Sequence, residues 1–174
     1  MGTATTTGGE DQGMSGGHDR FAAVELVNRW WFNYDEGNLA VLDGLLTEDC
    51  RTTSRTELGT HPSEEFIRSD RRGREAVMAW KREHRRQSPY PLRHNATNVH
   101  VVAERGEELD LDSYLLVTQI VDRRPSPLSS GLVHWTLVRT DEGYRVRAQH
   151  TVLDSIESAP FHAVDYVSGR VDAW

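Results

Sequence analysis

The apolar positions between Asp19 and Glu36 follow the period of an amphipathic helix. The side chains that form this apolar face are Ala23, Val27, Trp30, Trp31 and Tyr34. Asp19 is a suitable N-cap for this helix, and Gly37 is a natural residue to end it. Asn38 can cap a second, shorter helix, which we expect over residues 39–46.

Beyond the second helix the sequence predicts one more helix and, mainly, strands with alternating apolar and polar positions. A Thr-rich strand is predicted over residues 50–56, a loop or helical turn over 61–70, and a third helix over 74–86. Four further strands are predicted over residues 92–103, 111–121, 132–140 and 144–153. Three helices followed by an antiparallel meander predict an α+β fold.

The last predicted hairpin allows a register to be derived. Its loop, Asp141-Glu142-Gly143, fits a type I turn with a G1 bulge, which pairs Thr140 with Tyr144. His134 then lies opposite His150. A two-residue loop would shift the register by one and separate the two histidines.

The same register divides the hairpin into two faces. The face of His134 and His150 also carries small and apolar side chains, so we expect open space above it. The other face carries Val133, Trp135 and Leu137, with arginines around them. A monomer would expose these apolar side chains, so we expect a homodimer that buries them, with a homotrimer as the alternative.

Length and composition narrow the classes of protein. The 174 residues suit one domain, and 20 Lys and Arg against 27 Asp and Glu give a charge of −7, which argues against a nucleic-acid partner. Residues 1–18 hold few apolar side chains and are predicted to be a disordered leader, and residues 159–174 a C-terminal extension. With no apolar run of ~18–20 residues and no signal-peptide pattern, we expect no membrane partner and a cytoplasmic location.

Candidate chemistry lies in a few titratable residues. Asp35 sits beside the apolar face of the first helix, where it is either a base or histidine partner, or a solvated carboxylate at a helix end. His94 is either a site residue or a histidine on an exposed edge strand, and His134 and His150 are ligands, a proton relay or packed core side chains. The basic residues of the third helix, including Lys81, are typical of a solvated face, with an acidic partner or substrate as the alternative.

Metal and disulfide chemistry find little support in the sequence. Cys50 is the single cysteine, which excludes an intrachain disulfide and a cysteine zinc cluster. No histidine–carboxylate spacing typical of metal ligands is present, so no metal site is predicted.

Three segments together resemble SnoaL-like proteins of the nuclear transport factor 2-like superfamily. They are the helix that ends in Tyr34-Asp35 and continues into Asn38–Cys50, the strand Leu92–Val99, and the hairpin through Asp141–Tyr144. The resemblance covers residues 19–158. It implies a cone in which a curved antiparallel sheet wraps three N-terminal helices around an apolar pocket.

Among these families, scytalone dehydratases carry the most similar catalytic pattern. The resemblance implies that Tyr34 polarises a substrate carbonyl, Asp35 orients a histidine, and His94 exchanges protons. It implies a substrate pocket lined by Trp31, Trp80, Asn98, His134 and His150, with no cofactor. The expected activity is that of a dehydratase, cyclase or isomerase acting on a hydrophobic cyclic ketone or polyketide-like molecule.

The sequence also departs from the scytalone dehydratase pattern. Residues 114–121 lack the second pocket histidine, for which His150 could substitute, and Leu132 stands where the pocket asparagine is expected. Two alternatives therefore stay open. One is a structural β subunit that partners a dioxygenase α subunit, because the strands around His94 and His150 also resemble that group. The other is a ligand-binding member of the superfamily without catalysis.

Overall fold

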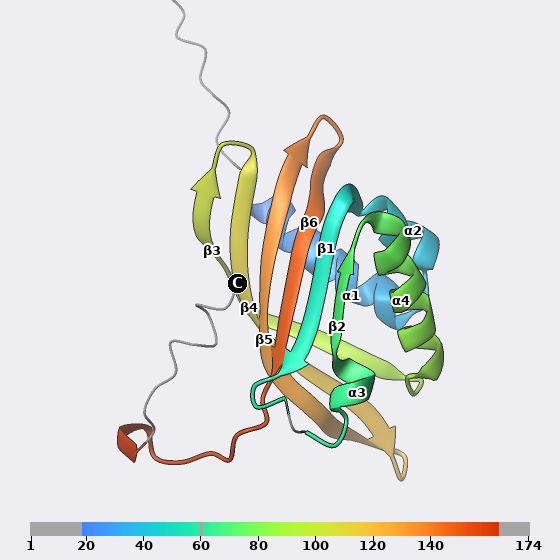
Figure 1. Cartoon of the computed structure of the whole chain (residues 1–174), viewed down its shortest axis with the longest axis vertical. Helices are drawn as coiled ribbons and strands as arrows, with labels where there is room; N and C mark the ends of the chain where they lie inside the picture. The colour runs from blue at the N-terminus through green and yellow to red at the C-terminus, as the bar shows by residue number, and fades with distance from the viewer. Residues whose placement is uncertain (1–18, 60, 164–174) are drawn as a thin grey trace, which may run out of the picture.

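Six strands form one curved sheet, and the helices pack against its concave side (Figure 1). The structure, a computed structural model, describes residues 19–59 and 61–163. The predicted leader and the extension beyond residue 163 lie outside the described residues. In chain order the elements are α1 (Arg20–Asp35), α2 (Leu39–Gly44), β1 (Leu46–Thr56), α3 (Glu64–Ile67), β2 (Ser69–Arg72), α4 (Arg74–Gln87), β3 (Leu92–Arg105), β4 (Glu108–Val121), β5 (Arg124–Thr140), β6 (Gly143–Leu153) and the 3₁₀ turn η1 (Phe161–Ala163).

The predicted α+β architecture is confirmed. The Asp19 side chain caps α1 by accepting a hydrogen bond from the Ala22 amide at 3.0 Å, as its position predicted. The strand order is β2-β1-β6-β5-β4-β3, so the sheet is mixed: β3 to β6 form the predicted antiparallel meander, and β1 runs parallel to β6. Figure 1 shows that the sheet does not close, and that β3 begins below the C-terminal end of α4.

His134 lies opposite His150, as predicted, but the loop that sets this register differs from the prediction. Thr140 pairs with Gly143, so the loop has two residues, Asp141 and Glu142. A bulge between the Thr136 and Leu137 pairs shifts the ladder back by one residue. The shift from the short loop and the shift from the bulge cancel, which brings the two histidines opposite each other.

The assignment of the two faces of this hairpin was wrong. Val133, Trp135 and Leu137 are at most 1% exposed and face the core, where Trp135 contacts the Trp30 ring edge to face at 6.0 Å. The bulge breaks the alternation along β6 and turns Val146 to this same inner face. The surface proposed for a homodimer is therefore part of the core, while the oligomeric state itself stays a prediction.

The core lies between α1 and the sheet. Its largest fully buried side chains include Trp30 and Tyr34 of α1, Met78 of α4, and Trp135 of β5. Figure 1 shows that the start of β3, the end of β4 and the start of β5 bend toward the side of the sheet on which α4 lies. No helix in residues 19–59 and 61–163 has the length and apolar character that a bilayer crossing requires.

Candidate functional site

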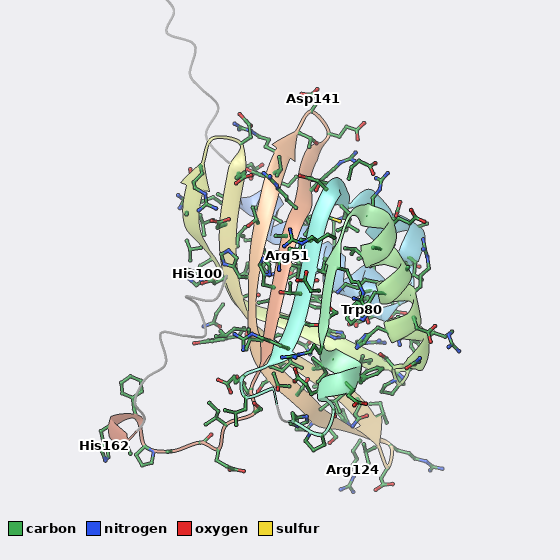
Figure 2. All side chains as sticks on the ribbon, in the orientation of Figure 1. Arg51, Trp80, His100, Arg124, Asp141 and His162 are labelled. Carbon is green, nitrogen blue, oxygen red and sulfur yellow. The ribbon has the colours of Figure 1, made fainter. Side chains whose placement is uncertain are left out.

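A cavity of about 310 Å³ opens at the end of the sheet where α1 and α4 finish. This volume is at the lower end of the ~300–1,000 Å³ range for small-molecule sites. Its apolar wall includes Trp31, Phe66, Trp80, Leu92, Leu115 and Val117. Figure 2 shows Trp80 on the side of α4 that faces the sheet. Five side chains with titratable groups reach the cavity: those of Tyr34, Lys81, His84 and His94, and that of His61, which is exposed.

Asp35 and His94 form a close, buried polar pair at the cavity wall. The Asp35 carboxylate accepts a hydrogen bond from His94 Nδ1 at 2.5 Å and another from the His94 amide at 2.7 Å. Both side chains are almost buried, with 5% and 9% of their surface exposed. Asp35 occupies Nδ1 of the imidazole, so Nε2 is the ring nitrogen that remains for a ligand. Among the described residues, no hydrogen-bond partner of Nε2 is found.

The Trp31 ring fixes the plane of the His94 imidazole. The two rings are stacked, with centroids 4.5 Å apart and an angle of 4° between their planes. Trp31 and Asp35 are one helical turn apart on α1, so the same helix face provides both the stacking surface and the carboxylate. The side chain of His94 is therefore held in both position and orientation.

Arg85 of α4 holds the end of α1 that carries these residues. Its guanidinium donates hydrogen bonds to the Tyr34 carbonyl at 3.1 Å and to the Asp35 carbonyl at 2.7 Å. These carbonyls lie in the last turn of α1, where a positive charge is favourable, and the Tyr34 carbonyl also accepts a hydrogen bond from the Gly37 amide at 3.2 Å. Arg85 thus joins α4 to the C-terminal end of α1.

Tyr34 pairs with a histidine that the sequence did not single out. Its hydroxyl is hydrogen-bonded to Nδ1 of His84, and the His84 ring is stacked between Phe66 at 4.4 Å and Trp80 at 4.7 Å. Burial holds the pKa of Tyr34 well above its usual value, so the phenol keeps its proton. Burial, with the nearby Lys81 charge, lowers the pKa of His84 to about 3, so this imidazole is neutral at pH 7.

His84 thus adds a half-buried histidine to the cavity beside His94, and it comes from α4 instead of from a strand. The signal in the sequence was its spacing of four residues from Trp80, which places both side chains on one side of a helix.

Lys81 is buried in the cavity wall, which corrects its assignment to a solvated face. Only 6% of the residue is exposed, and Nζ donates a hydrogen bond to Gln149 Oε1 at 3.0 Å. Burial lowers the pKa of Lys81 to about 7.

The comparisons with known proteins agree with this architecture. The family model for the SnoaL-like domain matches residues 18–150. The chain belongs to the SnoaL-like family. Comparison with curated proteins gives no match.

Solved structures with a similar fold extend the comparison. Their identities to this chain are 12–20%, so the likeness concerns the fold. An NTF2-like protein with a cystatin-like fold from Novosphingobium aromaticivorans is 20% identical, with a TM-score of 0.65 over 88% of this chain and 87% of that one. The β subunit of a candidate aromatic-ring-hydroxylating dioxygenase from the same species has 12% identity and a TM-score of 0.63 over 81% and 92%. A candidate scytalone dehydratase from that species has 15% identity and a TM-score of 0.61 over 84% and 95%.

The SnoaL-like cavity includes some of the residues predicted from the sequence and not others. Trp31, Tyr34, Trp80 and His94 line it, and Asp35 stands directly behind His94. Asn98 is exposed, has a φ of 54° and lies where the β3–β4 register shifts, outside the residues that line the cavity.

His134 and His150 lie on the sheet face opposite the core and do not line the cavity. Nδ1 of His134 donates to Asp112 at 2.6 Å, and Nδ1 of His150 pairs with the Thr53 hydroxyl at 2.7 Å. His150 is therefore not placed to substitute for a second pocket histidine. Within residues 19–59 and 61–163, no group of three His, Cys, Asp or Glu side chains is arranged to hold a metal ion.

Proposed function

We propose that the cavity is the active site of an acid–base enzyme that acts on a hydrophobic carbonyl compound. A cyclic ketone or polyketide-like molecule suits the volume and the aromatic wall, and the reaction class is that of a dehydratase, cyclase or isomerase. The observation that carries the proposal is the Asp35–His94 pair, which leaves the second imidazole nitrogen for a ligand in an apolar cavity.

His94 acts as the base in the proposed mechanism. With Asp35 accepting from Nδ1, the lone pair of the neutral imidazole is at Nε2, where it can take a proton from the carbon next to a carbonyl. The imidazolium that forms is stabilised by the Asp35 carboxylate and by the face of the Trp31 ring. In a dehydration, the same Nε2–H returns its proton to the leaving hydroxyl.

Tyr34 stabilises the negative charge that develops on the carbonyl oxygen. When neutral His84 is protonated at Nδ1, it donates to the Tyr34 oxygen, and the phenolic proton is then available to the substrate. A hydrogen-bond donor fixed in an apolar site stabilises an enolate more strongly than water does. The high pKa of Tyr34 keeps that donor protonated throughout the neutral pH range. All of these steps use side-chain protons, so the proposal includes no cofactor.

Two observations support this reading. A candidate scytalone dehydratase has a similar fold, which supports the proposal at the level of architecture. A structural β subunit, the alternative suggested by the dioxygenase neighbour, does not need a carboxylate–histidine pair in an apolar cavity. Co-purification with a larger iron-bearing subunit would instead favour the β subunit.

The test is the exchange of α-protons in a hydrophobic bicyclic ketone, 2-tetralone, in D₂O, followed by NMR. We expect the protein to accelerate exchange and both Asp35→Asn and His94→Gln to reduce the acceleration by ~10²–10⁴-fold. His100→Gln is the matched control, because His100 is an exposed residue of the same strand and lies far from Trp80 in Figure 2. Exchange at the wild-type rate in both site variants would remove the pair from the mechanism.

A further inference from the structure

Lys81 is the single lysine in a chain that contains 19 arginines. The two residue types are not equivalent, because arginine stays charged in proteins whereas a buried lysine can lose its proton. The one lysine occupies a buried position in the cavity wall, and its neighbours Arg82, Arg85 and Arg86 on α4 are exposed or half-buried. This contrast singles out the amine of Lys81.

The Nζ atom of Lys81 is surrounded by aromatic rings and lacks a negatively charged partner. The ring centroids of Trp30, Trp31, Tyr34 and Trp80 lie 5.2–5.9 Å from it. Its hydrogen bond goes to the neutral amide of Gln149, and no carboxylate forms an ion pair with it among the described residues. The aromatic faces favour the ammonium, and the loss of hydration favours the neutral amine.

The loss of hydration on burial outweighs the aromatic faces in its effect on the pKa of Lys81. With a pKa of about 7, roughly half of the Lys81 side chains hold a free lone pair at neutral pH, compared with ~1 in 2,500 for an ordinary lysine. A neutral amine on a side chain that lines a ligand cavity can act as a nucleophile.

We propose that Lys81 Nζ condenses with the carbonyl group of a ligand in this cavity to form an imine. The inference rests on the proposed function, because it takes its ligand class, aldehydes and ketones, from that proposal. It adds covalent attachment, which the acid–base steps of Tyr34 and His94 do not include. It also excludes esters and carboxylic acids as ligands for this step, since these do not form imines with amines under such conditions.

The condensation balances without any further reactant. The Nζ lone pair forms the N–C bond while the C=O π pair moves to the oxygen. That oxygen gains the two protons that Nζ gives up, and His94 and Tyr34 are the cavity groups able to carry them. The oxygen leaves as water with the C–O bonding pair, and the electron pair of the second N–H bond becomes the N=C π bond. Addition of water reverses the sequence and releases the carbonyl compound.

The test uses the full chain, with benzaldehyde as probe and sodium cyanoborohydride to reduce any imine to a stable benzylamine. The chain has only two kinds of amine, the α-amino terminus and Lys81, so intact mass and peptide mapping assign each product. The terminus, with its ordinary pKa of ~7.7–8.0, reports that the reagents are active. Arg82→Lys adds an exposed lysine next to Lys81 in the same molecule and serves as the internal reference.

At pH 7 we expect Lys81 to be benzylated at least ~100-fold faster than the added lysine at position 82, because far more of its amine is neutral. Unfolding the Arg82→Lys protein in urea should make the two rates equal. Modification of the terminus without Lys81, or equal rates in the folded protein, would overturn the proposal and leave Lys81 as a packed side chain.

The two proposals can fail separately. If Lys81 is not benzylated but 2-tetralone exchange still depends on His94, the imine is wrong and the acid–base site stands. If Lys81 is benzylated but exchange does not depend on Asp35 or His94, the acid–base mechanism is wrong.

Discussion

The three polar side chains to which we assign chemistry, those of His94, Tyr34 and Lys81, are each held by a hydrogen bond with another protein group. Asp35 holds His94 at Nδ1, and His84 holds the Tyr34 hydroxyl. Gln149 holds the Lys81 amine through a hydrogen bond from Nζ to Oε1. These pairs orient the reactive groups before a ligand arrives, which is the arrangement that electrostatic catalysis requires. The arrangement has a cost in stability, which is largest at the buried amine.

The burial of Lys81 predicts that its effect on stability depends on pH. The unfolded chain holds a proton on this amine up to about pH 10.5, and the folded chain only up to about pH 7. Between these values the unfolded state binds more protons, so wild-type stability rises with pH. His84 and Tyr34, which pack against Lys81, stay neutral over this range.

In Lys81→Met we expect the free energy of unfolding to exceed that of the wild type at pH 7. The difference should shrink by ~1.4 kcal/mol for each pH unit between 7 and 10. Urea unfolding at pH 7, 8 and 9 measures it, with Arg82→Met as the exposed control. Parallel pH profiles for the wild type and Lys81→Met would contradict the burial of a deprotonated amine.

At the scale of elements, the sequence predicted where helices and strands lie better than which way they face. The boundaries of α1 and α4 follow from capping residues and apolar spacing, and the prediction for each is within about one residue. The inward face of the last hairpin depends on a bulge in β6, where one extra residue interrupts the alternation, and the regular alternation assumed from the sequence did not include it.

The candidate site was predicted only in part, for a similar reason. Asp35 and His94 were singled out by their positions in a helix and a strand, and the family resemblance then assigned roles to them and to Tyr34, whereas Lys81 was assigned to a solvated face and His84 was not named as a site residue. Their spacing from Val77, at i+4 and i+7, marks the inner face of the helix, but charge alone assigned Lys81 to the surface. Spacing was the better guide because burial follows the helix face.

The contact between α4 and the end of α1 predicts that removal of Arg85 lowers stability more than removal of its neighbour Arg86. Arg85→Met keeps much of the aliphatic packing but removes the hydrogen bonds to the Tyr34 and Asp35 carbonyls. We expect a loss of about 1–3 kcal/mol in the free energy of unfolding and slower 2-tetralone exchange. Arg86→Met is the control, since Arg86 pairs with Glu83 at the surface, and we expect little change. Equal losses in urea unfolding would show that Arg85 does not hold the end of α1.

At the scale of the whole molecule, the cavity exists because the sheet bends around the ends of two helices. Residues from α1, α3, α4 and five strands, β1 and β3 to β6, meet there although they are far apart in the chain. The wall at the far end comes from Leu128 and Ser129 of β5 with Thr151 and Leu153 of β6. These strands approach each other closely at Gly131, which pairs with Leu153. The shape of the cavity therefore depends on a residue that does not line it.

Gly131→Ala should disturb both stability and ligand binding. A Cβ atom at Gly131 would lie 2.9 Å from the Leu153 Cα and closer still to the Val152 carbonyl oxygen, and this backbone cannot move without separating β5 from β6. We expect a loss of about 1–3 kcal/mol in the free energy of unfolding, measured in urea, and weaker quenching of Trp31 and Trp80 fluorescence by 2-tetralone. Gly44→Ala is the matched control, because a Cβ there meets nothing within 4 Å and alanine favours the helix. If the two substitutions behave alike, the close approach of β5 and β6 at Gly131 is not what shapes the cavity.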